Sequence, residues 1–224
     1  MKNIIITGTD TGVGKTICSA LLMSVLKGTY FKPVQSGCNE DNDTNTVKQL
    51  CELGDEHFLK EKYLLSEPLS PHLAAEIDGK EINLEELSEL PAEVKFKPLI
   101  TELAGGLMVP LNREALFIDI VKNWTSPKTK SGNYEVILCA RSSLGTINQA
   151  LLSIEALRAR EIPIAGLIFT GEGLKDNRKT IVQFSKVPEL GYIPTLEKIN
   201  RSNLIDAFYD NFNVNYFKEN YGLR

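Results

Sequence analysis

Short apolar runs alternate with amphipathic stretches along most of the chain. The first run, over residues 3–7, is rich in β-branched side chains, and a glycine-rich loop over 8–14 follows it. Residues 15–27 then place apolar side chains on one face of a helix, and a second strand-like run covers 29–34. The alternation returns with strands at 97–103, 135–140, 164–170 and 190–193 and helices at 146–159 and 177–184. Because the strands are almost wholly apolar, this order predicts an α/β fold, with a mostly parallel sheet and helices on both faces.

The segment between the second strand and residue 97 is polar and acidic. Its best helical stretches are 43–53 and 83–90, and no linker or break in composition separates it from the rest. We therefore expect a single domain over 1–224. The tail, 211–224, is rich in aromatic residues and asparagine, and the sequence leaves open whether it packs on the body or stays mobile.

Charge and composition indicate which kinds of partner the protein can bind and in which compartment it works. The 25 Lys and Arg against 29 Asp and Glu give a net charge of -4, which offers no general attraction to nucleic acid or to an anionic membrane. No apolar run approaches the roughly 18 residues of a spanning helix, and the N-terminus lacks a signal-peptide core. The four cysteines are far apart and suit reduced, mostly buried thiols. We expect a cytoplasmic protein that binds neither nucleic acid nor membrane.

The loop after the first strand is close to a phosphate-binding P-loop. Residues 8–16 read Gly-Thr-Asp-Thr-Gly-Val-Gly-Lys-Thr, against the pattern G-x-x-x-x-G-K-[ST], with the first glycine one residue early at Gly8. Gly12 and Gly14 let backbone N–H groups turn toward a polyphosphate. Lys15 can span the β- and γ-phosphates of ATP, and the Thr16 hydroxyl can ligate Mg²⁺. The motif predicts a P-loop NTPase-like fold that uses ATP and Mg²⁺.

Four ordered segments resemble the motifs of the dethiobiotin synthetase family. They are the loop over 8–16, Lys-Pro-Val-Gln-Ser-Gly over 32–37, Glu-Pro-Leu-Ser-Pro-His over 67–72 and Glu-Leu-Ala-Gly-Gly over 102–106. Segments 144–148 and 191–194 match more loosely. The resemblance implies an ATP- and Mg²⁺-dependent ligase of biotin biosynthesis. Such an enzyme closes the ureido ring of dethiobiotin from 7,8-diaminononanoate and CO₂ (or bicarbonate) through a phosphorylated carbamate.

The resemblance also assigns roles to residues. Lys32 becomes the second catalytic lysine beside Lys15, and Thr11 and Ser36 contact the diamine substrate. The metal ligands are Thr16, Glu102 and Asp43, although Asp43 could instead be a helix N-cap and Asp41 lies two residues away. The predicted nucleotide-binding residues are Gly12, Val13, Gly14, Lys15, Thr16, Ile17, Asp43, Glu102, Leu103, Ala104, Gly105, Thr170, Gly171, Pro194, Thr195 and Leu196.

A turn before the helix at 146–159 is expected to serve the other subunit of a homodimer. In the family this turn holds the substrate carboxylate, which here points to Leu144, Gly145 and Asn148. Thr170 stands where many members have an asparagine that reads adenine, so we hypothesise weak selectivity for the base. Leu103 likewise replaces the usual glycine after Glu102.

Two other protein classes with such a motif remain as interpretations. A regulatory or partitioning P-loop ATPase would act as a binding switch, but its characteristic lysine within the motif is replaced by Asp10. Amidotransferases that share the synthetase domain carry a further glutaminase domain, for which we expect no room in 224 residues. Of the two histidines, His72 is expected to be structural and His57 to face solvent.

Overall fold

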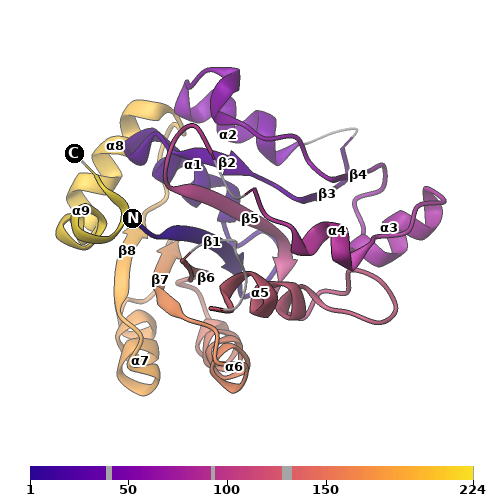
Figure 1. Cartoon of the computed structure of the whole chain (residues 1–224). Helices are drawn as coiled ribbons and strands as arrows, with labels where there is room; N and C mark the ends of the chain where they lie inside the picture. The colour runs from indigo at the N-terminus through magenta and orange to yellow at the C-terminus, as the bar shows by residue number, and fades with distance from the viewer. Residues whose placement is uncertain (39–41, 92–93, 128–132, 224) are drawn as a thin grey trace.

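A parallel sheet of six strands forms the centre of the molecule (Figure 1). The computed structural model describes residues 1–38, 42–91, 94–127 and 133–223. The sheet order is β2-β5-β1-β6-β7-β8, and every neighbouring pair is parallel. These strands are β1 (Asn3–Gly8), β2 (Thr29–Phe31), β5 (Leu99–Gly106), β6 (Tyr134–Arg141), β7 (Ile164–Thr170) and β8 (Glu189–Ile193).

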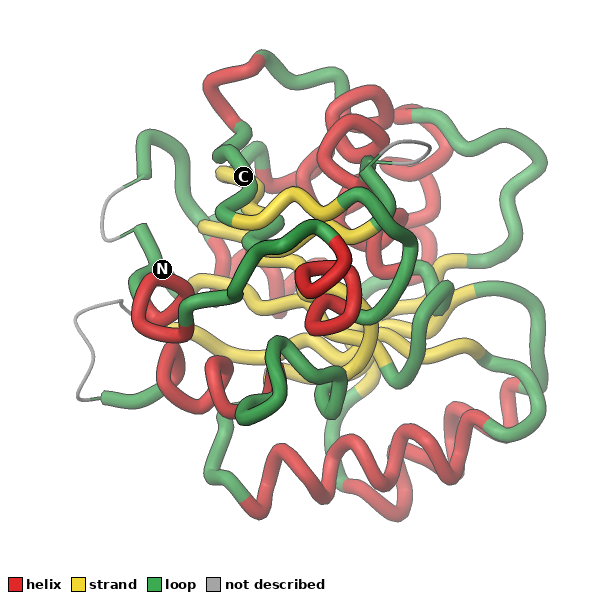
Figure 2. Tube along the Cα trace, turned by 90° about the vertical axis from the view of Figure 1, so that its right-hand side faces the viewer, coloured by secondary structure: helices red, strands yellow, loops and turns green. Residues whose placement is uncertain are grey.

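Helices cover both faces of this sheet, as Figures 1 and 2 show. The consecutive residues Ile4, Ile5 and Ile6 are all fully buried, which requires apolar cover on each side of β1. Helices α1, α2, α8 and α9 pack on one face, and α5, α6 and α7 on the other. The helices are α1 (Lys15–Leu26), α2 (Asp43–Cys51), α3 (Pro71–Ile77), α4 (Leu84–Ser88), α5 (Phe117–Thr125), α6 (Thr146–Ala159), α7 (Lys175–Ser185), α8 (Arg201–Asn211) and α9 (Val214–Tyr221), with a 3₁₀ turn η1 (Asp55–His57). The predicted α/β fold class is thereby confirmed.

The single strand expected over 29–34 is wrong. The chain forms β2 in the main sheet and then β3 (Val34–Ser36), which pairs in parallel with β4 (Tyr63–Leu65) in a separate two-stranded sheet. Pro33 lies at the break, and proline has no N–H group to donate to a ladder. Lys32 therefore lies between β2 and β3, and Ser36 is the last residue of β3; both line the same cavity as the P-loop.

The C-terminal tail packs on the body in the described residues. Phe217 and Tyr221 on α9 are buried, and the Lys2 N–H donates to Asn220 O at 3.1 Å. Tyr216 and Tyr221 both donate from their hydroxyls to Glu135, which also pairs with Lys2. The two termini therefore lie side by side (Figure 1).

His57 does not face solvent, and that expectation was wrong. Its ring is buried and stacks on Phe96 with 3.8 Å between centroids, and its Nδ1 lies 2.7 Å from Gly28 O. The charged neighbours of His57 suggested exposure, but the 3₁₀ turn buries His57 while the two residues before it, Asp55 and Glu56, are exposed. Cys18, Cys51 and Cys139 are buried free thiols, as expected.

None of the helices within 1–38, 42–91, 94–127 and 133–223 has both the length and the apolar character that crossing a membrane would need.

Candidate active site

The P-loop connects the carboxyl end of β1 to the first turn of α1, where ligands bind in sheets of this kind. Gly12 and Gly14 adopt φ values of 69° and 87°, in the left-handed region that favours glycine. A Cβ atom on Gly8 would lie 2.5 Å from Val13 Cγ2, which explains why the early glycine stands at this position. The Lys15 ammonium curls back over the loop and donates to Asp10 O at 3.1 Å.

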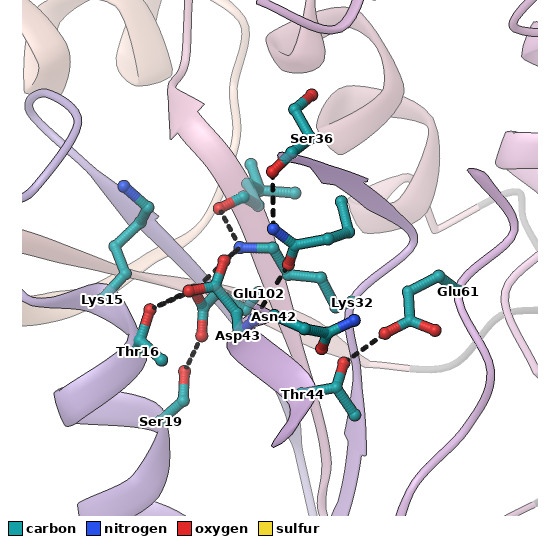
Figure 3. Close-up of polar contacts among 12 residues, drawn as sticks. Lys15, Thr16, Ser19, Lys32, Ser36, Asn42, Asp43, Thr44, Glu61 and Glu102 are labelled. Atoms are coloured by element: carbon teal, nitrogen blue, oxygen red, sulfur yellow. Dashed lines mark hydrogen bonds and ion pairs between the residues drawn. The ribbon is translucent and has the colours of Figure 1, made fainter. Parts of the chain in front are cut away.

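Glu102 lies at the centre of a buried polar cluster, shown in Figure 3. It comes from β5 and is fully buried. Its Oε1 accepts from Lys32 Nζ at 2.9 Å, and its Oε2 accepts from the hydroxyls of Ser19 at 2.5 Å and Tyr30 at 3.0 Å. Thr16 also donates to Oε1, at 3.2 Å. We call Thr16, Ser19, Tyr30, Lys32, Asp43 and Glu102 the Glu102 cluster.

Two members of the Glu102 cluster were not predicted from the sequence. Ser19 lies one helical turn after Thr16 on α1, so the two hydroxyls share a face of the helix, and that spacing was a usable signal. Tyr30 lies on β2, which pairs with β5 in the register Tyr30↔Ile100. The register brings the phenol next to Glu102, but no local pattern reveals it.

Lys32 bridges two carboxylates. Its Nζ lies 2.5 Å from Asp43 Oδ2 and 2.9 Å from Glu102 Oε1, and its side chain is only 2% exposed. Burial disfavours the ammonium form, but the two carboxylates outweigh it and hold the pKa of Lys32 above its usual value. Burial would likewise raise the pKa of Asp43, and Lys32 reverses this so that the pKa lies below its usual value. The Lys32 ammonium therefore lies between two carboxylates, and its ion pairs with both hold the side chain in place.

The pKa of Lys15 is shifted in the opposite direction from that of Lys32. Burial, and then repulsion from Lys32, lower the pKa of the Lys15 ammonium. Lys32 thus pairs with both carboxylates, whereas Lys15 faces the same cavity without an ion pair among the described residues, so its charge is available to an anionic ligand.

The oxygen donors predicted for the metal come together. Thr16 Oγ1 lies 2.7 Å from Asp43 Oδ1 and 3.2 Å from Glu102 Oε1, so one hydroxyl and two carboxylates converge. Asn42 is the N-cap of α2, because its side chain accepts from Asn45 N, and the Asp43 carboxylate is therefore not used as a cap. Asp41 lies outside the described residues. A small set of hard oxygens fits Mg²⁺, which takes one or two carboxylates together with phosphate oxygens and water.

A cavity of about 650 Å³ opens between the P-loop and the Glu102 cluster. Ser36 lines this cavity, and its buried hydroxyl has no hydrogen-bond partner among the described residues. An orphaned buried hydroxyl is available to a ligand. Of the predicted site residues, those that line the cavity are Thr11, Gly12, Gly14, Lys15, Thr16, Ile17, Lys32, Ser36, Asp43, Glu102, Ala104 and Gly105; Gln35, the segment 68–71 and Val109 complete the wall.

The remaining predicted nucleotide residues lie outside this cavity. Thr170 donates its hydroxyl to Val13 O at 2.8 Å, and its methyl group packs against Gly14. The Leu103 side chain is fully buried, although its carbonyl accepts from Lys32 Nζ at 3.4 Å. The others away from the cavity are Val13, whose side chain is in the core, Gly171 after β7, and Pro194, Thr195 and Leu196 after β8.

The turn expected to bind the substrate carboxylate is on the surface. Leu144 is 99% exposed, Gly145 has a φ of 91°, and Asn148 is exposed on α6. None of the three lines the cavity of its own chain. The neighbouring Arg141, which sequence reasoning missed, donates from Nη2 to Gly12 O at 2.9 Å and so ties β6 to the P-loop.

Comparisons with known proteins agree with this architecture. A family model described as "AAA domain" matches residues 2–203. The ATP-dependent dethiobiotin synthetase BioD of Rhodopseudomonas palustris strain HaA2 is 48% identical over 216 residues, covering 96% of each chain. The protein of the same name from strain TIE-1 is 47% identical over 205 residues, covering 92% of each, and that from Nitrobacter hamburgensis is 44% identical over 214 residues, covering 96% of each.

Solved structures show the same fold at much lower identity. A ParA family ATPase from Chlorobium tepidum TLS superposes with a TM-score of 0.54 at 13% identity, covering 92% of this chain and 90% of that one. The MinD cell division protein of Aquifex aeolicus gives a TM-score of 0.52 at 15% identity, covering 93% of this chain and 89% of that one. At such identities the likeness establishes the P-loop ATPase fold alone.

Proposed function

Because the chain belongs to the dethiobiotin synthetase family, we propose that it is an ATP-dependent ligase that closes the ureido ring of dethiobiotin. The substrates are 7,8-diaminononanoate, CO₂ and ATP. The observation that carries the proposal is Lys32, held charged between Glu102 and Asp43 and facing the same cavity as Lys15 of the P-loop. A binding switch has no need for a second buried lysine at this place.

The reaction explains why two lysines are useful. One amine of the substrate adds to CO₂ and loses a proton to give a carbamate, whose oxygen then attacks the γ-phosphorus of ATP while ADP leaves. The second amine attacks the carbonyl carbon of this mixed anhydride, phosphate leaves, and the amine proton is released. Both later steps gather negative charge at one point, and preorganised cations lower the free energy of such transition states. Lys32 is held by Asp43 and Glu102 before substrate arrives, so its charge needs no reorganisation.

Mg²⁺ fits the oxygens of Thr16, Asp43 and Glu102. When bound, the ion would neutralise charge on the ATP phosphates. Lys32 holds both carboxylates in position, and the oxygens that would face the ion are Asp43 Oδ1 and Glu102 Oε1, which lie beside the Thr16 hydroxyl.

Substrate contacts and assembly follow from the same proposal. Thr11 and the unpartnered hydroxyl of Ser36 face the cavity and would bind the diamine. Leu144, Gly145 and Asn148, exposed and remote from their own cavity, would bind the substrate carboxylate in a partner subunit, which makes the active form a homodimer. We also propose the cytoplasm as the compartment.

The decisive assay measures phosphate release from ATP with and without 7,8-diaminononanoate and bicarbonate, and follows the ureido product. We expect phosphate release to depend on both co-substrates and to match product formation one to one. A partitioning-type ATPase would instead hydrolyse ATP at the same rate in their absence. Such a result, without ureido product, would refute the ligase and favour that alternative.

Nucleotide selectivity provides a second prediction. Because the Thr170 hydroxyl is already bonded to Val13 O, it supports the P-loop and is not free to read a base. We expect CTP and GTP to give kcat/KM values within about tenfold of that for ATP, a difference of about 1.4 kcal/mol. Steady-state kinetics with the three nucleotides test this, and a strict requirement for ATP would contradict it.

The variant Thr170→Val tests whether this side chain supports the P-loop or reads the base. It keeps the shape and removes one hydrogen bond of about 1 kcal/mol, so KM should rise about fivefold for all three nucleotides alike. A change confined to one nucleotide would mean that Thr170 reads the base after all.

A further inference from the structure

A second cavity, of about 690 Å³, lies at the opposite edge of the sheet from the active site. Met1, which precedes β1, and Lys97, which precedes β5, both line it, so it lies where the parallel strands begin. The active site lies where they end. Helix α1 joins the two, since Lys15 starts it at the P-loop and Lys27 follows its last residue at this cavity, 12 helical residues or roughly 18 Å away. In Figure 1 this corner carries the N-terminus together with α8 and α9.

The charged side chains that line this cavity in the described part of the chain are all cationic. Lys27, Lys95, Lys97 and Arg201 line it, and no carboxylate does so among the residues that the structure describes. In that same part of the chain none of the four has an ion pair, and the buried Nε of Arg201 lacks any hydrogen-bond partner. A chain with a net charge of -4 thus gathers four uncompensated cations in one hollow. We call this cavity the basic pocket.

Helix ends modify this charge without reversing it. The C-terminal end of α1 points carbonyl groups toward the basic pocket, an effect equivalent to about half a negative charge. Arg201 is the first residue of α8, whose N-terminal end contributes a similar positive amount. The two ends nearly cancel, so the four side-chain cations decide the sign of the potential.

One wall of the basic pocket is aromatic. His57 and Phe96 form it as a stacked pair with an angle of 11° between the rings, and Lys95 Nζ lies 5.0 Å from the Phe96 centroid. Tyr209 on α8 also lines the pocket and is 53% exposed. Aromatic side chains beside these cations suit a ligand that combines a ring with an anionic group.

We propose that the basic pocket binds a phosphorylated small molecule with a flat apolar portion, at a site separate from that of ATP. Arginine matches phosphate through paired N–H groups, and lysines add point charges that need no fixed direction. The phosphate would lie between the Arg201 guanidinium and the lysines. The ring would lie along the His57 and Phe96 wall.

The three methionines allow the site to be tested separately from the active site. Met1 lines the basic pocket, Met23 is buried in α1, and Met108 precedes Val109, which lines the active-site cavity. In protein labelled with ¹³C at the methionine methyls and having its native N-terminus, phenyl phosphate should shift the Met1 signal saturably. Inorganic phosphate should do so more weakly, because it lacks the ring. An unchanged Met1 signal up to about 10 mM phenyl phosphate, a limit near the weakest measurable affinities, would overturn the proposal.

Paired variants test the role of charge. K27Q/R201Q removes two cations from the basic pocket, and we expect the affinity of phenyl phosphate measured at Met1 to fall at least about tenfold. K122Q/K179Q removes two exposed lysines from α5 and α7 and serves as a control with the same net charge, which should leave the affinity within about twofold. Equal affinities in the two variants would show that the pocket does not use these cations, and would overturn the proposal.

Discussion

Replacing Lys32 by alanine is expected to lower kcat for ureido product by about 10³-fold, the scale of removing one preorganised cation from a phosphoryl-transfer site. The ammonium is fixed within 2.9 Å of both Asp43 and Glu102 and faces the cavity that Lys15 also lines. Its charge is therefore in place before negative charge develops on the transferred phosphoryl group. Steady-state assays of ureido product measure the effect.

Two controls separate this chemical role from a loss of structure. Lys32→Arg keeps the charge, but the larger planar head does not fit the space between the two carboxylates, so it should restore little of the activity. Lys122→Ala removes an exposed lysine from α5 and should leave kcat unchanged. Circular dichroism should show the α/β fold in all three variants. Near-normal turnover in Lys32→Ala would mean that the catalytic lysine is elsewhere.

The sequence predicted most of the sheet because its strands are locally encoded. The strand at 164–170 and the helix at 146–159 match the structure at both ends, since an apolar β-branched run and a periodic helix each identify themselves within a few residues. The pairing of β3 with β4 was not predicted. It joins 34–36 to 63–65 across a long insertion, and such a contact depends on tertiary packing that no local pattern records.

The candidate site also contains residues that the sequence predicted and residues that it did not. Lys15, Thr16, Lys32 and Glu102 lie within contiguous motifs, and the structure brings them to one cavity. Ser19 and Tyr30 lie in no motif, yet they hold Glu102 through its second oxygen. Arg141 likewise contacts the P-loop only because β6 is adjacent to β1. Residues that orient other residues are set by neighbours in space, so they become visible only when the sheet order is known.

The change Glu102→Gln is expected to reduce both stability and turnover. Glu102 is fully buried and accepts from Lys32, Ser19, Tyr30 and Thr16, so an amide would place N–H groups against donors. Lys32 would also lose one of its two counter-charges while remaining 2% exposed. Breaking a buried ion pair from one side costs about 3 kcal/mol or more, which denaturant unfolding should show as a lower midpoint. Turnover should fall by at least about 10²-fold, because a predicted metal ligand is removed.

A double-mutant cycle with Lys32→Met distinguishes the loss of stability from the loss of turnover. The variant K32M/E102Q removes both buried charges, and only Asp43, whose side chain is 30% exposed, keeps its charge within reach of water. Its unfolding free energy should therefore exceed that of either single variant by about 1 to 2 kcal/mol, since the single changes are not additive. Turnover should stay at the level of Lys32→Ala. If the double variant is instead the least stable of the three, the Glu102 cluster is held together by its hydrogen bonds and not by the pairing of charges. If turnover returns with stability, Lys32 acts only by supporting the fold.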